Sequence, residues 1–353
     1  MSGPTASGFR APGWLRGAHA QTIYASQWCP RPTIAYRRER WDTPDGDFID
    51  VDLLAEPDAL GDRIDEEGES VPGATLDHDP RRTPWLVVFH GLEGSSRSPY
   101  ARTLMRFAQL QGWHGVVPHF RGCSGEPNRL ARAYHSGDTA EVEWLLRGLA
   151  RRAAGAPLYA VGVSLGGNAL LKWLGERGSA AAEVVDAAVG VCAPLDLCAA
   201  GAALERGLAR VYGWNFLRTL KPKASAKLAR FPGLFDHDRL RDATTMRHFD
   251  DVYTAPVHGY RDVGDYWSRA SSKPGLAAIA VPTLLINALD DPFLPSSVLP
   301  RADQVSSRVT LDYPRHGGHV GFVEGRFPGD PNWITRRIAD FLGATPAQTG
   351  GVD

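Results

Sequence analysis

Cysteine is scarce in this sequence, and its spacing excludes several classes of site. The 353 residues include four cysteines, Cys29, Cys123, Cys192 and Cys198, and no two of them have the Cys-x-x-Cys spacing. The sequence therefore predicts neither a zinc knuckle nor a framework of disulfide bonds. Such sparse, unpaired cysteines are typical of the reducing cytoplasm, where we expect this chain to be located.

An excess of positive charge is also missing, as are long apolar runs. Lysine and arginine total 39, against 40 aspartates and glutamates, which argues against nucleic acid or an anionic membrane as the main partner. No apolar run approaches the length of about 20 residues that spans a bilayer. The first residues, MSGPTASGFRAPGW, lack the basic and apolar blocks of a signal peptide. We therefore expect no stable membrane insertion and a small-molecule partner.

What the sequence does have is an alternation of short apolar runs with amphipathic segments. The apolar runs, of which the last alternates with polar residues, are 84–90, 115–120, 158–163, 186–194, 282–291 and 308–313. Runs that are apolar on both faces suit the central strands of a parallel sheet. Amphipathic segments lie at 99–111, 138–153, 165–177 and 332–342. The alternation predicts an α/β fold with a mostly parallel, doubly wound sheet, and a hairpin over 34–54 brings it to about eight strands.

Two long segments interrupt this alternation. Residues 58–84 are rich in Asp, Glu, Gly and Pro, and we predict a solvated acidic loop within the first part of the core, 1–195. Residues 196–275 favour helix and are rich in aromatic residues, which predicts a helical cap inserted between two strands. Its aromatic side chains are expected either to pack the cap on the sheet or to line a substrate pocket. The second part of the core covers 276–345, and residues 346–353 are predicted to be a disordered tail.

A glycine-flanked serine follows one of the apolar runs. Gly162-Val163-Ser164-Leu165-Gly166 has the pattern G-x-S-x-G, with a predicted strand ending at Val163 and an amphipathic helix beginning directly after the serine. This is the setting of a nucleophile elbow, in which a strained turn presents the serine and leaves no room for side chains two residues away on either side. The alternative is a glycine-rich turn that only packs a helix against the sheet.

A serine nucleophile needs a histidine base and a carboxylate that orients it. The run 282–291 ends in Asp290-Asp291, and we assign the acid to Asp291 because of its Asp-Pro-x-x-Pro setting, with Asp290 as a turn former. After the last run, the sequence YPRHGGHVGF contains His316 and His319; we assign the base to His319, which follows two glycines, and treat His316 as a surface residue. As metal ligands the two histidines lack a cysteine or carboxylate cluster to complete the site, so no metal is predicted.

Acyl transfer also needs donors for the oxyanion that forms at the carbonyl. In this type of fold one donor is the backbone N–H after the nucleophile, here Leu165, and the other comes from the loop after the third strand. The strand 84–90 leads into His90-Gly91-Leu92, so the N–H of Leu92 is the second predicted donor. Another serine among glycines, Ser124, has no amphipathic helix after it and is predicted to be structural.

Several motifs of the chain resemble the YheT-like branch of the α/β-hydrolases, the AB hydrolase 4 family. They are HAQT, HGLEGSSRSPYAR, HFRGCSGEPNR, YHSGDT, GVSLGGNALLKWLGE, FDDVYTAPVHGYRDVGDYW, NALDDPF and GGHVGF, and the resemblance extends from roughly Phe9 to Leu342. It implies the α/β-hydrolase fold and a triad of Ser164, Asp291 and His319. Bacterial members are regarded as carboxylesterases, and eukaryotic relatives act on acylglycerols, phospholipids or fatty-acid esters. Many of those relatives carry an N-terminal membrane anchor, which we do not expect here.

Together these features predict a serine hydrolase of short- to medium-chain carboxylic esters that acts through an acyl-enzyme and needs neither metal nor cofactor. Two alternatives use the same triad: an acyltransferase, and a lipase acting on acylglycerols or phospholipids. A third is a non-catalytic binding module, which the presence of all triad members disfavours.

Overall fold

The computed structural model describes residues 8–55 and 82–344, which form one eight-stranded sheet in the order β1-β2-β4-β3-β5-β6-β7-β8. Its strands are β1 (Tyr36–Asp42), β2 (Phe48–Leu54), β3 (Trp85–Phe89), β4 (His114–Pro118), β5 (Leu158–Val163), β6 (Ala187–Val191), β7 (Thr283–Ile286) and β8 (Val309–Asp312). β1 and β2 pair antiparallel, as do β2 and β4, and the pairs from β4 to β8 are parallel. The predicted mostly parallel sheet and its hairpin are confirmed, although the run 282–291 is a strand only as far as Ile286.

Helices cover both faces of the sheet. Val87 and Phe89 of β3 belong to an apolar cluster with α3 (Thr139–Ala153) and α4 (Leu165–Arg177). Leu86 and Val88 belong to a second cluster with α2 (Pro99–Leu110) and α11 (Trp333–Phe341). Because successive residues of one strand are buried on opposite sides, the strand is apolar throughout, as the sequence pattern predicted. The doubly wound arrangement is confirmed.

Strand β2 is buried although it carries two aspartates. Asp50 receives two hydrogen bonds from the Arg40 guanidinium, at 2.7 and 2.9 Å, and Asp52 receives two from Arg38 at the same distances. Bidentate pairs of this kind compensate the loss of hydration of buried carboxylates. The hairpin can therefore continue the sheet with charged residues on its inner strand.

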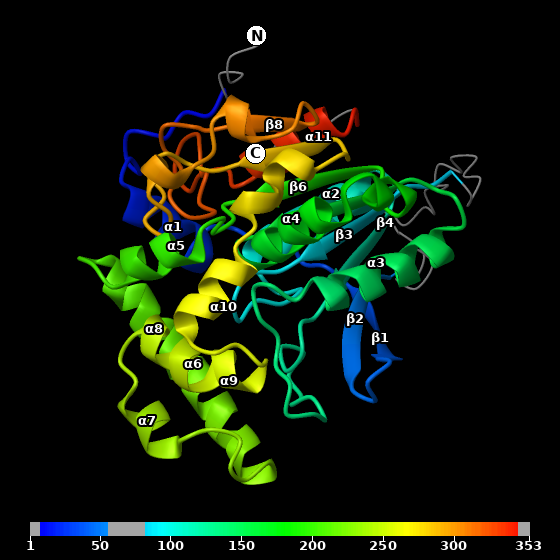
Figure 1. The fold of residues 1–353 in the computed structure, drawn as a ribbon. Helices are drawn as coiled ribbons and strands as arrows, with labels where there is room; N and C mark the ends of the chain where they lie inside the picture. Colours follow the sequence, from blue (N-terminus) through cyan, green and yellow to red (C-terminus); the bar gives the residue numbers. More distant parts are fainter. Residues whose placement is uncertain (1–7, 56–81, 345–353) are drawn as a thin grey trace, which may run out of the picture.

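Only helices and loops connect β6 to β7 within residues 192–282. They are α5 (Leu197–Leu204), α6 (Ala209–Arg230), α7 (His237–Asp242), α8 (Met246–Phe249), a π-helical turn (Asp250–Thr254), α9 (Ala255–Val257), α10 (Val263–Ala270) and a 3₁₀ turn (Lys273–Ala278). Figure 1 shows α6 to α10 in green to yellow, gathered below one end of the sheet. These helices have an apolar cluster of their own, which includes Leu217, Leu240 and Phe249. We propose that residues 196–275 act as the cap.

A helix that the sequence did not predict, α1 (Ala18–Gln27), lies near the N-terminus. Most of the predicted acidic loop, 58–84, and the predicted disordered tail, 346–353, lie outside the described residues. In the described parts of the chain we find no helix with both the length and the hydropathy that a bilayer span requires.

Candidate active site

Ser164 occupies a sharp turn between β5 and α4. Its backbone has φ 52° and ψ −119°, a conformation that side-chain-bearing residues rarely adopt. The flanking glycines are required by close backbone contacts. A Cβ atom on Gly162 would lie 2.5 Å from the carbonyl oxygen of Gly166, and one on Gly166 would lie 2.5 Å from that of Phe89. These features match a nucleophile elbow that lifts the hydroxyl above the carboxyl edge of the sheet.

The predicted base and acid lie beside this serine. His319 Nε2 is 3.0 Å from Ser164 Oγ, and His319 Nδ1 is 2.9 Å from one carboxylate oxygen of Asp291 and 3.2 Å from the other. The Asp291 side chain is fully buried, and its carboxylate also accepts the backbone N–H of Phe293 at 2.8 Å. The structure thus brings together three residues that are far apart in the sequence, in the geometry of a nucleophile, a base and an orienting acid.

The neighbouring pair, Asp290 and His316, lies outside this chain of hydrogen bonds. One Asp290 oxygen accepts the backbone N–H of Gly318 at 2.9 Å, and the other is 3.2 Å from Nδ1 of the exposed His316. Asp290 therefore shapes the histidine loop, while Asp291 is the carboxylate that contacts His319.

The two predicted oxyanion donors lie in loops that flank the serine. A Cβ atom on Gly91 would come within 3.2 Å of Ser164 Cβ, so the loop after β3 passes directly over the serine. The N–H groups of Gly91 and Glu93 donate to tyrosine hydroxyls at 2.8 and 3.0 Å. Among the described residues, the N–H groups of Leu92 and Leu165 have no acceptor. Both leucines line the same cavity as Ser164, so their N–H groups are available to an oxyanion.

Comparison with known proteins agrees with this arrangement. A family model described as the alpha/beta hydrolase fold matches residues 84–326. The chain belongs to this family. YheT of Escherichia coli (strain K12), which is provisionally named an esterase, is 44% identical over 306 residues, or 86% of this chain and 84% of YheT. The resemblance found in the sequence is thereby confirmed.

More distant relatives extend the comparison. The mouse phospholipase ABHD3 is 29% identical over 334 residues, which cover 94% of this chain and 77% of that protein. Among solved structures, the Pyrococcus furiosus esterase Pf2001 superposes with a TM-score of 0.53 at 14% identity, covering 98% of this chain and 100% of Pf2001. The similarity to Pf2001 establishes the fold alone. The chain is a hydrolase of the esterase and lipase type.

In this α/β-hydrolase two cavities meet at Ser164. The larger has a volume of about 580 Å³ and extends beneath the helices of residues 196–275. The second, of about 460 Å³, lies between α1, the loop after β3 and α6. Leu92, Ser164 and His319 line both, so an ester held at the serine can extend in two directions.

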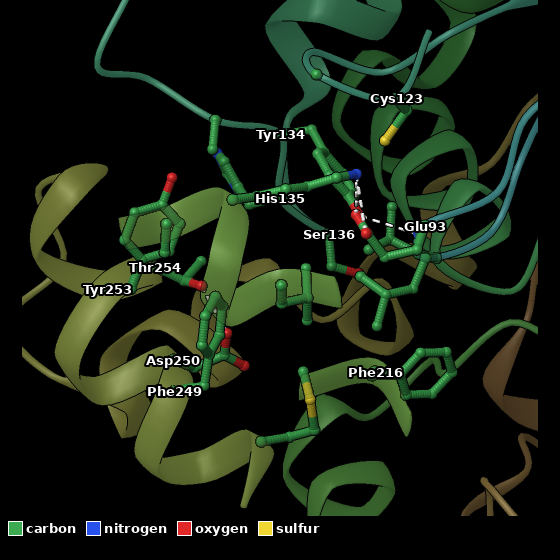
Figure 2. A pocket seen from close by; sticks show the side chains of 18 of the residues that line it. Glu93, Cys123, Tyr134, His135, Ser136, Phe216, Phe249, Asp250, Tyr253 and Thr254 are labelled. Carbon is green, nitrogen blue, oxygen red and sulfur yellow. Dashed lines mark hydrogen bonds and ion pairs between the residues drawn. The ribbon is translucent and has the colours of Figure 1, made fainter. Parts of the chain in front are cut away.

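Aromatic residues of the helical insertion line the larger cavity, and they pack against other helices of the insertion instead of against the sheet. Figure 2 shows Phe249, Asp250 and Tyr253 on one side of the larger cavity, with Glu93 and Phe216 across from them. Phe249 and Tyr253 also belong to the apolar cluster of the insertion. They therefore pack the helices together with one part of their surface and line the cavity with another.

Helix α1 supports the histidine loop of the hydrolase, which the sequence analysis did not predict. The hydroxyl of Thr22 accepts the backbone N–H of His319 at 2.8 Å. Gln21 is fully buried, and its side-chain amide bonds both the N–H and the carbonyl of Val323, at 2.8 and 2.9 Å. Phe293 adds a stacked ring contact with His319, with 4.0 Å between ring centroids. The motif HAQT was visible in the sequence, but only as part of the family resemblance.

Cys192 is a second residue of the site that the sequence analysis missed. It follows β6 with φ 48° and is 1% exposed, and its Sγ accepts the N–H of Val320 at 3.3 Å. Ligand-type atoms of Cys192, Asp291 and His319 lie within 4.8 Å of one another. His316 is not part of this group, which contains only one of the two histidines considered as metal ligands in the sequence. Burial, together with the Asp291 carboxylate, raises the pKa of the Cys192 thiol well above its usual value. The thiol therefore stays neutral beside Asp291.

Proposed function

We propose that this hydrolase cleaves carboxylic esters of short- to medium-chain acids through an acyl-enzyme on Ser164. The observation that carries the proposal is the distance of 3.0 Å between Ser164 Oγ and His319 Nε2, with Asp291 on the opposite nitrogen of the ring. The names of the relatives support it, since YheT is provisionally named an esterase and ABHD3 a phospholipase.

In the first half of the reaction, Ser164 Oγ attacks the ester carbonyl carbon and His319 Nε2 takes the hydroxyl proton. Asp291 accepts the hydrogen bond from Nδ1–H, which keeps the ring in the required tautomer and stabilises the imidazolium that forms. The carbonyl oxygen becomes an oxyanion, to which the N–H groups of Leu92 and Leu165 donate. Removing one such donor typically costs about 10²–10³-fold in turnover.

In the second half, the tetrahedral intermediate collapses and the bond to the alcohol oxygen breaks. The imidazolium of His319 gives its proton to that oxygen, so the alcohol leaves as a neutral molecule. Water then attacks the carbonyl carbon of the acyl-enzyme and transfers a proton to His319. When this second tetrahedral intermediate collapses, its bond to Ser164 Oγ breaks and the His319 imidazolium returns the proton to Oγ, which releases the acid and restores the free serine. The sequence of steps uses only these residues and water.

Replacement of the serine tests the proposal. Ser164→Ala should lower kcat for p-nitrophenyl butyrate by more than about 10³-fold, because the nucleophile is lost. Ser124→Ala is the matched control, since this serine also lies next to a glycine but lines neither cavity. It should retain the wild-type rate. Comparable activity of Ser164→Ala and wild type, with both proteins folded, would exclude the proposed function.

A further inference from the structure

The peptide unit that carries the Leu92 N–H is held through its carbonyl group. This carbonyl belongs to Gly91, and in a planar trans peptide the carbonyl and the N–H point in opposite directions. The Gly91 oxygen accepts the backbone N–H of Gly94 at 2.9 Å and lies 2.8 Å from Nδ1 of the buried His90. These contacts fix one side of the peptide and with it the direction of the N–H, which is the predicted oxyanion donor.

The next residue, Glu93, is held in a strained conformation by Tyr134. Its φ of 55° is rare for a residue with a side chain and persists only where surrounding groups impose it. The Glu93 N–H donates to the Tyr134 hydroxyl at 3.0 Å, and that hydroxyl donates to the Glu93 carboxylate at 2.9 Å (Figure 2). Burial, with Cys123 and Glu93 nearby, raises the pKa of Tyr134 well above its usual value, so the hydroxyl keeps its proton.

A lysine of the helical insertion pairs with the same carboxylate. The Lys223 ammonium, on α6, lies 2.9 Å from one Glu93 oxygen and 2.8 Å from the other. The Glu93 side chain is 10% exposed, and among the described residues no other lysine or arginine forms an ion pair with it. A buried carboxylate without a cation is costly, so the position of Glu93 depends on the position of α6.

The side chain of Leu92 provides a second contact between this loop and the insertion. It packs against the apolar cluster of the insertion, which includes Leu217 and Leu220 of α6. Two successive residues of the loop after β3 therefore contact the insertion, one through apolar packing and the other through an ion pair. A displacement of α6 would act on both ends of the peptide that joins Leu92 to Glu93.

We propose that Tyr134 and Lys223 are positioning residues of the oxyanion hole, which act through Glu93 on the N–H of Leu92. The helical insertion thereby takes part in forming the oxyanion hole, in addition to lining the larger cavity. This inference rests on the proposed function, since it assigns to two further residues the task of placing one of its donors.

Removal of a single hydroxyl tests the role of Tyr134. Tyr134→Phe keeps the ring, which stacks on Phe120 with 5.6 Å between centroids, and loses both hydrogen bonds to Glu93. It should lower kcat for p-nitrophenyl butyrate by about 10-fold or more with little change in KM, because a displaced donor weakens binding of the transition state more than binding of the ester. Tyr313→Phe is the control: its hydroxyl donates to the Pro300 carbonyl at 3.0 Å, and it lines neither cavity. It should keep the wild-type kcat.

Variants of Lys223 test the contribution of the insertion. Lys223→Met should lower kcat by about 3-fold or more, and Lys223→Arg should restore most of the rate because it restores the ion pair. In a Glu93→Met background, Lys223→Met should cause no further loss, since the lysine acts through that carboxylate. Arg218→Met is the control on the same helix, because Arg218 is exposed and lines neither cavity. An additional loss in the Glu93→Met background, or an equal loss in Lys223→Arg and Lys223→Met, would overturn the role assigned to Lys223.

An inhibitor separates positioning of the donor from a general loss of structure. Hexyl trifluoromethyl ketone adds to a serine nucleophile to give a hemiketal oxyanion, which needs the same donors as the transition state. In Tyr134→Phe and Lys223→Met its Ki should rise by the factor by which kcat/KM falls, while titration with a fluorophosphonate counts as many active sites as in wild type. Fewer active sites with an unchanged Ki would assign these residues to stability alone and overturn the inference.

The remaining outcomes distinguish this inference from the proposed function. Wild-type kcat and Ki in both Tyr134→Phe and Lys223→Met would overturn the inference and leave ester hydrolysis by Ser164 intact. Absence of ester hydrolysis by the wild-type enzyme would instead contradict the proposed function.

Discussion

At the scale of single residues, backbone strain collects around the proposed nucleophile. Glu93, Ser164, Cys192 and Val320 all have positive φ values between 48° and 59° although none is a glycine, and all four line a cavity that contains Ser164. Such conformations cost about 1–3 kcal/mol each and persist only where surrounding packing imposes them. These strained residues therefore gather around the serine, at the junction of the two cavities.

The strained backbone at Ser164 predicts that glycine is a more stable replacement than alanine at this position. Ser164→Gly should be more stable than Ser164→Ala by about 1 kcal/mol, because glycine adopts this φ without a steric penalty. Both variants should be inactive on esters. Urea unfolding monitored by tryptophan fluorescence measures the difference, and equal or lower stability of the glycine variant would show that the turn is not strained.

The two adjacent aspartates should differ sharply when replaced. Asp291→Asn should lower kcat for p-nitrophenyl butyrate by about 10⁴-fold, because the amide favours the wrong tautomer of His319. Asp290→Asn keeps an oxygen for the N–H of Gly318 and should cost far less. Steady-state kinetics of the two variants decide between them, and a larger loss in Asp290→Asn would reassign the acid.

At the scale of elements, α1 connects the N-terminal region to the histidine loop. Thr22→Val removes the acceptor of the His319 N–H while nearly keeping the shape of the side chain. A small displacement of the base should lower kcat by about 10-fold or more with little change in KM. Thr22→Ser should restore the rate, since it restores the hydroxyl. An equal loss in both variants would indicate a general packing role instead of positioning of His319.

The π-helical turn of the insertion carries a buried carboxyl group with pH-dependent consequences. Burial raises the pKa of Asp250 to about 6, although the Thr254 hydroxyl and the Trp267 indole N–H donate to it at 2.6 and 2.8 Å. In the unfolded chain its pKa is about 3.9, so between roughly pH 4 and 6 the folded state binds more protons. The contribution of Asp250 to stability is therefore present at low pH and is lost as the pH rises through about 6.

This linkage is measured against Asp250→Asn, which does not titrate. The free energy of unfolding of wild type minus that of the variant should decrease between pH 4.5 and pH 7, by an amount on the order of 2 kcal/mol. Chemical denaturation at both pH values gives this difference. A difference that stays constant, or that grows with pH, would contradict the raised pKa.

At the scale of the whole molecule, the features predicted from sequence are those with a local signature. Apolar runs and amphipathic segments located the strands and helices of the sheet, and Ser164 was found because its glycines flank it within one turn. Thr22 and Cys192 escaped prediction because their roles depend on contacts with a distant loop. Thr22 and His319 are separated by 297 positions, and no local pattern records such a contact. The second cavity escaped for the same reason, since α1 was not predicted.

Whether Ser164 is the nucleophile is measured by covalent labelling with a fluorophosphonate ester, with the labelled residue located by peptide mass spectrometry. We expect a stoichiometric adduct on Ser164, absent in Ser164→Ala and formed much more slowly in His319→Ala, because the base activates the hydroxyl. Ester turnover should disappear in step with the labelling. An adduct on another residue, or continued turnover with Ser164 fully labelled, would contradict the assignment of Ser164 as the nucleophile.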